Sequence, residues 1–543
     1  MTSGFDTKLR HGPDGALRDP ITDVDEKRFP TVELDPNFPP PHFSNRVVDV
    51  GDIEQDSVPI EKVTYLTIGG GVGSFIWVDN LVIRGAPQTD IASVGMEESP
   101  YGRCKRLLEQ SQISAYERLR SDSGSTPDNI WGWPGYAARE ILEDISNGRL
   151  RHALKVAGKI ISEPLLIDSY TPNSGRVYDS LDREAQRIGW GKIARIGRVC
   201  AIRTTNDGRY VAAYAARAGG EYQYRYIIGQ YLHLAVGHIT VRLLPYLRKY
   251  RENEHELERV VNVYEEHSHI YDYLKDHGGT VAVRGRGIAC AHIIQRISEV
   301  RQHGADIEVR HLMRKPLKAP SDFLGNSRLL EHNWEIQPYS FPKAAWGGDL
   351  RYMMEYSDDI VRADFLQRWG GTTSSDRRDR RRIIAEGLNQ GWYQIVYGSL
   401  SDMREEDNGR VTLLVRRPGE SQLADYTVDF VIDATGVDDD LHRSPLLKDL
   451  IETYDLPLNT MQGLLVSQCF ELQAIRQSKG RAYAVGAPTL GSYFAPVDSF
   501  LGLQYAAQLA IEDMRSAGAP NIEIFDFYRS ASRWLRWARG ASP

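Results

Sequence analysis

Cysteine is scarce in this chain. It occurs four times in 543 residues, and no two cysteines form a C-x-x-C pair. Small disulfide scaffolds need many cysteines, and structural zinc sites and redox dithiols use closely spaced pairs. The sequence therefore does not support a disulfide framework, and no metal site is expected. The four positions are Cys104, Cys200, Cys290 and Cys469.

Long apolar runs and a dominant charge are also missing. No apolar stretch approaches the roughly 18–20 residues that cross a bilayer, and the first residues, MTSGFDTKLRHGPDG, lack the apolar core of a secretory signal. Lys plus Arg total 66 against 73 Asp plus Glu, a formal charge of -7. That balance gives the chain no overall positive electrostatic potential that would attract nucleic acid or an anionic membrane. We expect a cytoplasmic protein without nucleic-acid or membrane partners.

The rest of the composition is typical of a folded protein. Hydrophobic residues make up 41 % of the chain and charged residues 26 %, and the length predicts three or four structural units. Residues 1–58 are rich in proline and charge, and Pro39–Pro41 favour extended backbone, so an irregular arm is expected there. Residues 316–422 are rich in Trp, Arg and Gly, and no clear element can be assigned within them.

A first glycine-rich turn follows a β-prone run at 63–68. The turn reads GGGVGS, and a helical stretch and a second strand at 91–94 follow it, which is the order of a βαβ unit. A diphosphate needs backbone N–H donors, close approach of the chain and the positive end of a helix. An acidic residue after the second strand holds ribose hydroxyls in such units. The candidate contacts are Gly69, Gly71, Gly73, Ser74, Glu97 and Glu98.

A second turn of the same kind begins at Gly285. It follows a strand at 280–284 and precedes a helix at about 292–303 and a strand at 307–312. Basic residues near the end of that strand lie where a 2′-phosphate would sit, which favours NADP over NAD. One such turn is a weak signal, but two turns 216 residues apart are a much stronger one. The candidate contacts here are Gly285, Gly287, Cys290, Arg310, Arg314 and Lys315.

With these turns, the chain resembles flavoproteins that have two dinucleotide-binding domains, and most of all the class B flavin-dependent monooxygenases. In that group the chain crosses between the domains at Ala-Thr-Gly segments. Residues 235–237 read Ala-Val-Gly, and residues 434–436 read Ala-Thr-Gly. A His-Ser-x-x-Tyr segment precedes the second turn in the family, and residues 267–271 match it. The resemblance covers about residues 60–315 and 425–515.

The resemblance implies an α/β fold with two Rossmann-like domains, the NADP domain being inserted in the FAD domain. The implied division is a 1–58 arm, an FAD-binding part at 59–240, a 241–279 linker, an NADP-binding domain at 280–425, a second FAD-binding part at 426–520 and a C-terminal helix at 521–543. FAD would occupy the first turn and NADP(H) the second. Further cofactor contacts are then Thr435 and Gly436 at a crossing, and Asp498 and Ser499 at a helix N-terminus facing the flavin.

The implied function is an FAD-dependent oxidoreductase that takes hydride from NADPH and oxygenates a small organic substrate through a flavin C4a-hydroperoxide. The substrate would be an amine, thioether or ketone, and no side chain is assigned a catalytic role. Two alternatives stay open: a flavin reductase or dehydrogenase without oxygenation, and a non-catalytic NADPH/FAD-binding scaffold or sensor. A homo-oligomer is also an open expectation.

Three aromatic segments lie outside this scheme. Trp131 and Trp133 flank a Pro-Gly turn and fit either a place near the flavin or core packing. Trp346 and Trp369 favour the core of an insertion over a substrate pocket. The basic and aromatic C-terminal stretch fits a membrane surface or a partner, but docking onto the body of the protein is favoured.

Overall fold

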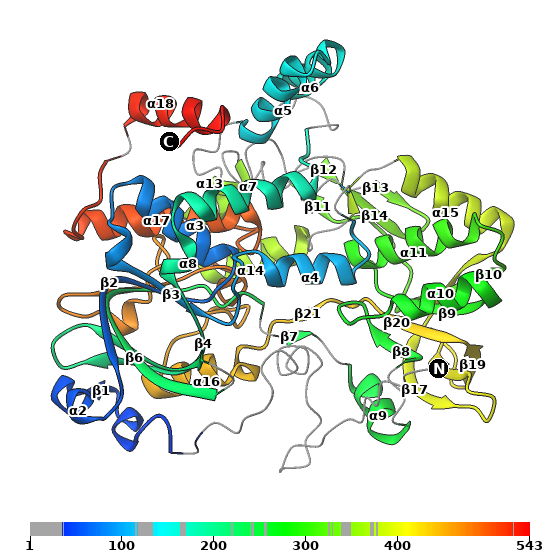
Figure 1. Ribbon diagram of the computed structural model, residues 1–543. Coiled ribbons are helices and arrows are strands. Elements are labelled where there is room, and N and C mark those ends of the chain that lie inside the picture. Colours follow the sequence, from blue (N-terminus) through cyan, green and yellow to red (C-terminus); the bar gives the residue numbers. More distant parts are fainter. Residues whose placement is uncertain are drawn as a thin grey trace.

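The molecule is built around two β-sheets that lie side by side, each flanked by helices (Figure 1). The computed structural model describes residues 35, 37–114, 117, 134–162, 170–218, 221–238, 240–241, 244–254, 258–323, 326–327, 329–337, 349–369, 374–375, 378–524 and 526–543. Trp131, Trp133 and Trp346 lie outside these residues.

The first sheet has seven strands in the order β1-β4-β3-β2-β6-β22, with β5 pairing β4 and β6. Strands β4, β3, β2, β6 and β22 run parallel, and β5 is antiparallel to its two neighbours. The strands are β1 (Val47–Val48), β2 (Ile60–Ile68), β3 (Ile91–Gly95), β4 (Ala194–Thr205), β5 (Tyr210–Ala218), β6 (Glu221–Leu234) and β22 (Arg481–Ala484).

The second sheet has five parallel strands in the order β16-β10-β9-β20-β8. They are β8 (Val260–Asn262), β9 (Gly279–Arg284), β10 (Ile307–Met313), β16 (Tyr393–Tyr397) and β20 (Phe430–Asp433). A three-stranded antiparallel sheet adjoins it, formed by β17 (Ser399–Glu405), β18 (Val411–Arg416) and β19 (Leu423–Val428). Short strands complete the set: β7 (Thr240–Val241), β11 (Asp322–Phe323), β12 (Asn326–Ser327), β13 (Leu329–Glu331), β14 (Trp334–Gln337), β15 (Ser374–Ser375) and β21 (Val437–Asp438).

Helices cover both sheets, and most connect successive strands. In the first half they are α2 (Val50–Gln55), α3 (Val72–Ile83), α4 (Gly102–Gln110), α5 (Gly135–Ser146), α6 (Leu150–Ser162), α7 (Ser174–Arg187), α8 (Trp190–Ile193) and α9 (Pro245–Glu254). In the second half they are α10 (Ser268–His277), α11 (Ile288–Arg301), α13 (Asp349–Tyr356), α14 (Asp359–Trp369), α15 (Arg378–Gln390), α16 (Pro445–Tyr454), α17 (Phe500–Ser516) and α18 (Phe527–Ala538). None of the helices in these ranges has the length and apolar character that a bilayer crossing requires.

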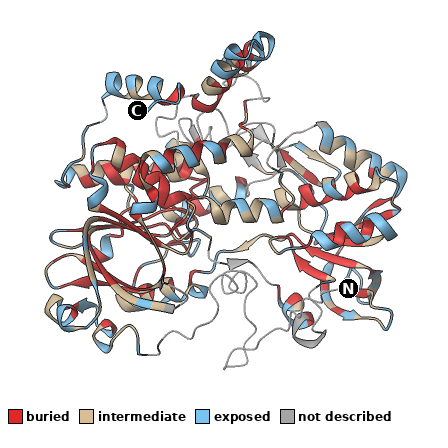
Figure 2. Ribbon diagram, in the orientation of Figure 1, coloured by how far each residue is buried: buried red, intermediate tan, exposed pale blue. Residues whose placement is uncertain are grey.

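Helix α3 is buried along nearly its whole length, because it lies between the first sheet and other helices. Only Val82 of its twelve residues is not buried, and its core includes Phe75 and Trp77. Figure 2 shows the same pattern for the sheet beneath it, whose strands are mostly buried. An apolar helix on a parallel sheet is what the βαβ pattern predicts, so the start of α3 is held firmly in place.

The chain passes between the sheets twice, and the passing segments pair with each other. Strand β7 follows the first sheet, β21 follows the second, and the two are antiparallel. The expected domain limits stay predictions, but two strands lie elsewhere than those limits imply. Strand β20 pairs with β9 although 426–520 is assigned to the FAD-binding part, and β8 pairs with β20 although 241–279 is assigned to a linker.

The two ends of the chain pack on the first half of the fold where they are described. Strand β1 pairs with β4, and Phe43 is buried beside it, so the later part of the 1–58 arm is ordered. At the other end, α18 buries Trp537 against α5. Trp369 is also buried, in the core under the first sheet.

Candidate functional site

A large cavity of about 1180 Å³ reaches from the first glycine turn to the second. Its lining comes from both sheets, both crossing segments and the start of α17. The sequence-predicted residues that line it are Gly69, Gly71, Gly73, Glu97, Gly285, Gly287, Arg314, Lys315, Thr435, Gly436 and Asp498. Those that do not line it are Ser74, Glu98, Cys290, Arg310 and Ser499.

The first turn brings the backbone into contact with the end of strand β6. The N–H of Gly69 donates to the carbonyl of Val94 at 2.8 Å, and its φ is +127°. A Cβ added there would lie 2.2 Å from the carbonyl oxygen of Ala235, so only glycine fits. Gly71 is different: it caps α3 with an extended φ of -96°, and an added Cβ would meet no atom within 4 Å. The space beside Gly71 is therefore open for a ligand at the helix N-terminus.

Ser74 lies behind this turn and faces the protein. Its Oγ is 2.9 Å from Oγ1 of Thr67, which is 2.9 Å from Nδ1 of His233. All three residues are fully buried, and His233 stacks on Trp77 with ring centroids 4.7 Å apart. Burial lowers the pKa of His233 to about 3, so its imidazole is neutral. The chain of hydrogen bonds fixes α3 to two strands, so Ser74 holds the turn in shape from behind.

Of the two acidic candidates, Glu97 faces the cavity. It is buried, and Arg106 of α4 binds its carboxylate with both guanidinium nitrogens, one at 3.0 Å and one at 2.5 Å. The side chain of Glu98 is exposed, and its carbonyl accepts a hydrogen bond from Nε1 of Trp190 at 3.2 Å. Of the two, Glu97 is thus the residue that lines the cavity, with Arg106 orienting its carboxylate.

The second turn repeats the geometry of the first. Gly285 has a φ of +134°, and a Cβ added there would lie 2.2 Å from the carbonyl oxygen of Ala434. The same distance separates an added Cβ on Gly69 from the carbonyl oxygen of Ala235. Gly287 caps α11 with a φ of -81°, and an added Cβ would meet nothing within 4 Å. Two helix N-termini with open glycines therefore border one cavity.

A buried histidine also supports the second turn. Nε2 of His311 donates to the carbonyl of Gly285 at 2.5 Å, and Nδ1 accepts from the hydroxyl of Tyr393 at 2.6 Å. Burial is the main reason that the pKa of His311 falls to about 4. Sγ of Cys290 lies 3.5 Å from the same Nε2, and burial raises the pKa of this thiol. Cys290 therefore packs behind the turn as an inert thiol.

The basic residues at the end of β10 divide into two groups. Arg310 turns away from the cavity, donates to Glu308 at 2.6 Å and contacts Gln394. Arg314 and Lys315 line the cavity. The expected cation cluster for a 2′-phosphate is therefore reduced to these last two.

The second crossing places Thr435 and Gly436 in the wall of the cavity. The N–H of Thr435 donates to Oδ1 of Asp433 at 3.1 Å. Its Oγ1 is buried and has no hydrogen-bond partner in the part of the chain that the structure describes. Gly436 follows with a φ of +105°.

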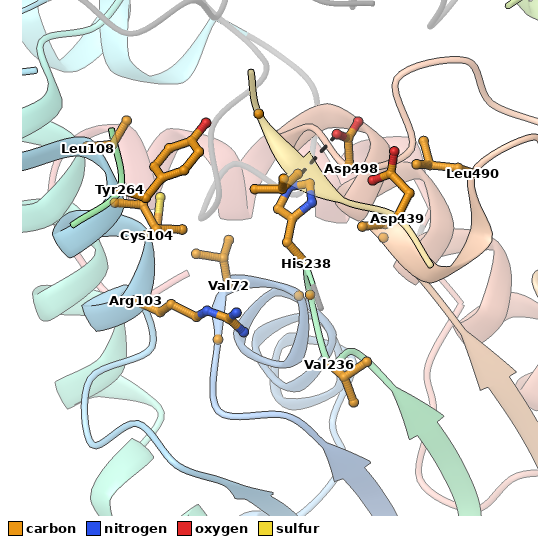
Figure 3. Close-up of a pocket in the computed structure, with 18 of the residues that line it drawn as sticks. Val72, Arg103, Cys104, Leu108, Val236, His238, Tyr264, Asp439, Leu490 and Asp498 are labelled. Carbon is orange, nitrogen blue, oxygen red and sulfur yellow. Dashed lines mark ion pairs between the residues drawn. The ribbon is translucent and has the colours of Figure 1, made fainter. Parts of the chain in front are cut away.

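The start of α17 closes the cavity on the opposite side. Ser499 is its N-cap, and its Oγ accepts from the N–H of Gly502 at 3.0 Å. Asp498 points into the cavity, where its Oδ2 lies 4.0 Å from Nε2 of His238 on the first crossing (Figure 3). Ser499 thus caps the helix, and Asp498 is the residue that faces the cavity.

Sequence reasoning missed three kinds of residue here. His233 and His311 support the turns, Arg106 holds Glu97, and His238 faces the cavity. His238 directly follows the Ala-Val-Gly crossing, and this position in the sequence is the one signal that could have indicated it. The other three act across strands or helices and give no local pattern.

Comparison with known proteins identifies the fold. No family model matches the chain, and no curated protein matches it. Among solved structures, the ornithine hydroxylase PvdA from Pseudomonas aeruginosa aligns with a TM-score of 0.57 and 14 % identity, covering 83 % of this chain and 98 % of that one. The FAD-bound cadaverine monooxygenase DfoA from Erwinia amylovora aligns with a TM-score of 0.60 and 12 % identity. The alignment covers 85 % of this chain and 96 % of that one.

A third match is the ornithine N-hydroxylase KtzI from Kutzneria sp. 744, solved with reduced FAD, NADP+ and L-ornithine. It gives a TM-score of 0.59 and 14 % identity over 84 % of this chain and 100 % of that chain. At these identities the likeness concerns the fold. The chain is similar to N-hydroxylating flavin monooxygenases in having two Rossmann-type domains, the second inserted in the first, as the sequence predicts.

Proposed function

We propose that this protein is an FAD-dependent oxidoreductase that uses NADPH and oxygenates a small organic amine. The observation that carries the proposal is that two glycine turns, each at a helix N-terminus, open on one cavity. Two dinucleotides bound at these turns would meet between the domains, as hydride transfer requires. The proposal includes a cytoplasmic location and a small-molecule substrate.

The first turn fits FAD. Gly69 permits the close approach to β6, Gly71 leaves room for a diphosphate, and Glu97 is placed for ribose hydroxyls. When bound, FAD supplies the two-electron redox chemistry and the reaction with oxygen. The protein's part is to hold the cofactor, exclude water and place the substrate.

The second turn fits NADPH. Gly285 and Gly287 repeat the cradle, and Arg314 and Lys315 supply positive charge at its rim. Two cations near a 2′-phosphate favour NADPH over NADH by direct electrostatic attraction. Thr435 and Gly436, which line the cavity at the second crossing, are further contacts.

The start of α17 is the place for the flavin ring. A capped helix directs the positive end of its dipole into the cavity, where negative charge on the reduced ring would be stabilised. His238 and Asp498 lie together at this end, with Nε2 of His238 4.0 Å from Oδ2 of Asp498.

The amine substrate class rests on the structural neighbours. Their names give ornithine and cadaverine as substrates, and both are primary amines. The decisive experiment combines three measurements on the purified protein: the spectrum of bound flavin, its bleaching by NADPH without oxygen, and product formation with diamine and amino-acid substrates in air. Hydroxylated amine in step with NADPH use supports the proposal. Bleaching with hydrogen peroxide as the sole product indicates the reductase, and a protein that binds no flavin contradicts both.

A further inference from the structure

Two amphipathic helices lie at the same end of the molecule, away from the cavity. They are α6 and α18, both at the top of the view in Figure 1. Helix α5 lies between them. Nε of its Arg139 donates to the carbonyl of Trp537 at 3.0 Å, and the guanidinium carbon lies 3.5 Å from the centroid of the Trp537 ring. Helix α5 therefore packs against both helices.

Helix α6 carries an apolar stripe that is exposed in the part of the chain that the structure describes. Leu150, Leu154 and Ile161 are 59 %, 73 % and 79 % exposed. Their spacing of four and seven residues places them on one face of the helix. Ala153 and Val156 are buried on another face, so packing onto the body is already satisfied without the stripe. Three large exposed side chains in a row are unusual on a face that meets only water.

Helix α18 has the same arrangement. Trp537 is fully buried, whereas Tyr528 and Leu535, seven residues apart, are 83 % and 46 % exposed. The exposed pair again shares one face. Docking onto the body, as expected from the sequence, thus uses one face of α18 and leaves a second apolar face outside.

Both helices are strongly basic although the chain as a whole is acidic. Residues 149–162 hold four Lys or Arg and no acidic residue, and residues 527–539 again hold four and none, against a total charge of -7. Some of these pair locally, as Arg149 does with Asp144 at 2.9 Å. The basic residues that are exposed beside the stripes are Arg151, Lys155, Arg536 and Arg539.

We propose that this surface, formed by the exposed stripes of α6 and α18 with their flanking basic residues, binds an anionic lipid bilayer. Apolar side chains beside Lys and Arg are the pattern of helices that lie in a membrane interface. A two-fold contact with a second copy would instead set basic rows against each other. The total charge of -7 does not reveal this local concentration of basic residues.

The test is sedimentation of the full-length holoprotein with vesicles. Vesicles of phosphatidylcholine with phosphatidylglycerol are compared with pure phosphatidylcholine, at low and high salt. We expect binding to the anionic vesicles only, weakened by salt. The variant Arg151→Gln/Lys155→Gln/Arg536→Gln removes three exposed charges and lowers apparent affinity about 100-fold. The variant Leu154→Ser/Ile161→Ser also weakens binding, because it removes the apolar stripe.

A matched control is Lys275→Gln/Arg416→Gln, which removes exposed charges on the second domain and leaves binding unchanged. Flavin content and NADPH oxidation should be the same in all variants, so this test is independent of the proposed enzymatic function. Failure to sediment with anionic vesicles, equal loss in the control, or a dimer that the Leu154→Ser/Ile161→Ser variant breaks would overturn the proposal.

Discussion

At the scale of single residues, glycines in the same turn have opposite roles. Gly69 and Gly285 are required by the protein, because a side chain would collide with a crossing carbonyl. Gly71 and Gly287 have ordinary backbone angles and open space around them. The fold therefore does not require glycine at the second pair, and we propose that the ligand does.

Replacing Gly71 with valine is expected to abolish FAD binding. The new side chain would fill the space at the N-terminus of α3 that we assign to the diphosphate, while the backbone stays unstrained. The measurement is flavin absorbance per purified protein, with circular dichroism to monitor the fold. Gly191→Val, at another exposed glycine with no atom near its Cβ, serves as the control. Full flavin content in Gly71→Val would contradict the assignment.

Replacing Gly287 with valine should separate the two cofactors. We expect normal FAD content but a KM for NADPH at least about 10-fold higher. A 10-fold weaker affinity corresponds to about 1.4 kcal/mol of binding free energy. One well-placed hydrogen bond can supply that amount. Steady-state oxidation of NADPH measures this. If flavin is lost as well, the two turns do not bind their ligands separately.

Ser74 and Cys290 mark the limit of motif reading at this scale. Both occupy the third motif position, and both were predicted to contact cofactors, yet each faces the interior. The small size of the third residue serves the packing between helix and strand. A motif gives the type of residue, but which way the side chain points depends on the sheet beneath it.

At the scale of elements, strand β10 carries His311, which supports the turn, and leads into Arg314 and Lys315, which we propose as the 2′-phosphate contacts. These contacts are tested by Arg314→Ala/Lys315→Ala. We expect the KM for NADPH to rise about 10-fold or more while that for NADH changes little, because only NADPH carries the 2′-phosphate. Arg310→Ala is the matched control, since Arg310 is bound to Glu308. An equal effect of the control would place the phosphate elsewhere.

The support is His311, and it makes stability depend on pH. Its pKa is about 4 in the folded protein and about 6.5 when unfolded. Below pH 6.5 the unfolded chain binds the proton more readily, so stability falls as pH falls from 6.5 towards 4. The loss is about 1.4 kcal/mol per pH unit at most. Apparent melting temperature at pH 7 and pH 5 measures it, and His311→Gln should show a smaller difference between the two pH values than the natural protein.

Local elements were well predicted, and pairings distant in sequence were not. The strand, turn and helix at 63–83 follow from adjacent residues. The place of β8 beside β20 depends on residues about 170 positions apart, and a three-residue strand gives too short a pattern to reveal it.

At the scale of the whole molecule, the cavity is the junction of the two domains. Its walls come from both sheets and both crossings, so a ligand there binds elements of both domains at once. We expect removal of FAD to lower the apparent melting temperature, and its return to restore it. At FAD concentrations of 100 times the Kd, the stabilisation is about 2.7 kcal/mol. No change in melting temperature would mean that the flavin lies outside this junction.

The carbonyl groups of Ala235 and Ala434 each rest against the first glycine of a turn. Each alanine is also the residue from which the chain leaves its domain, towards β7 in one case and β21 in the other. The two covalent links between the domains are thereby anchored at the rear of the two cradles. Any rotation of one domain relative to the other must pull on a cradle, and a bound dinucleotide must in turn stiffen the hinge.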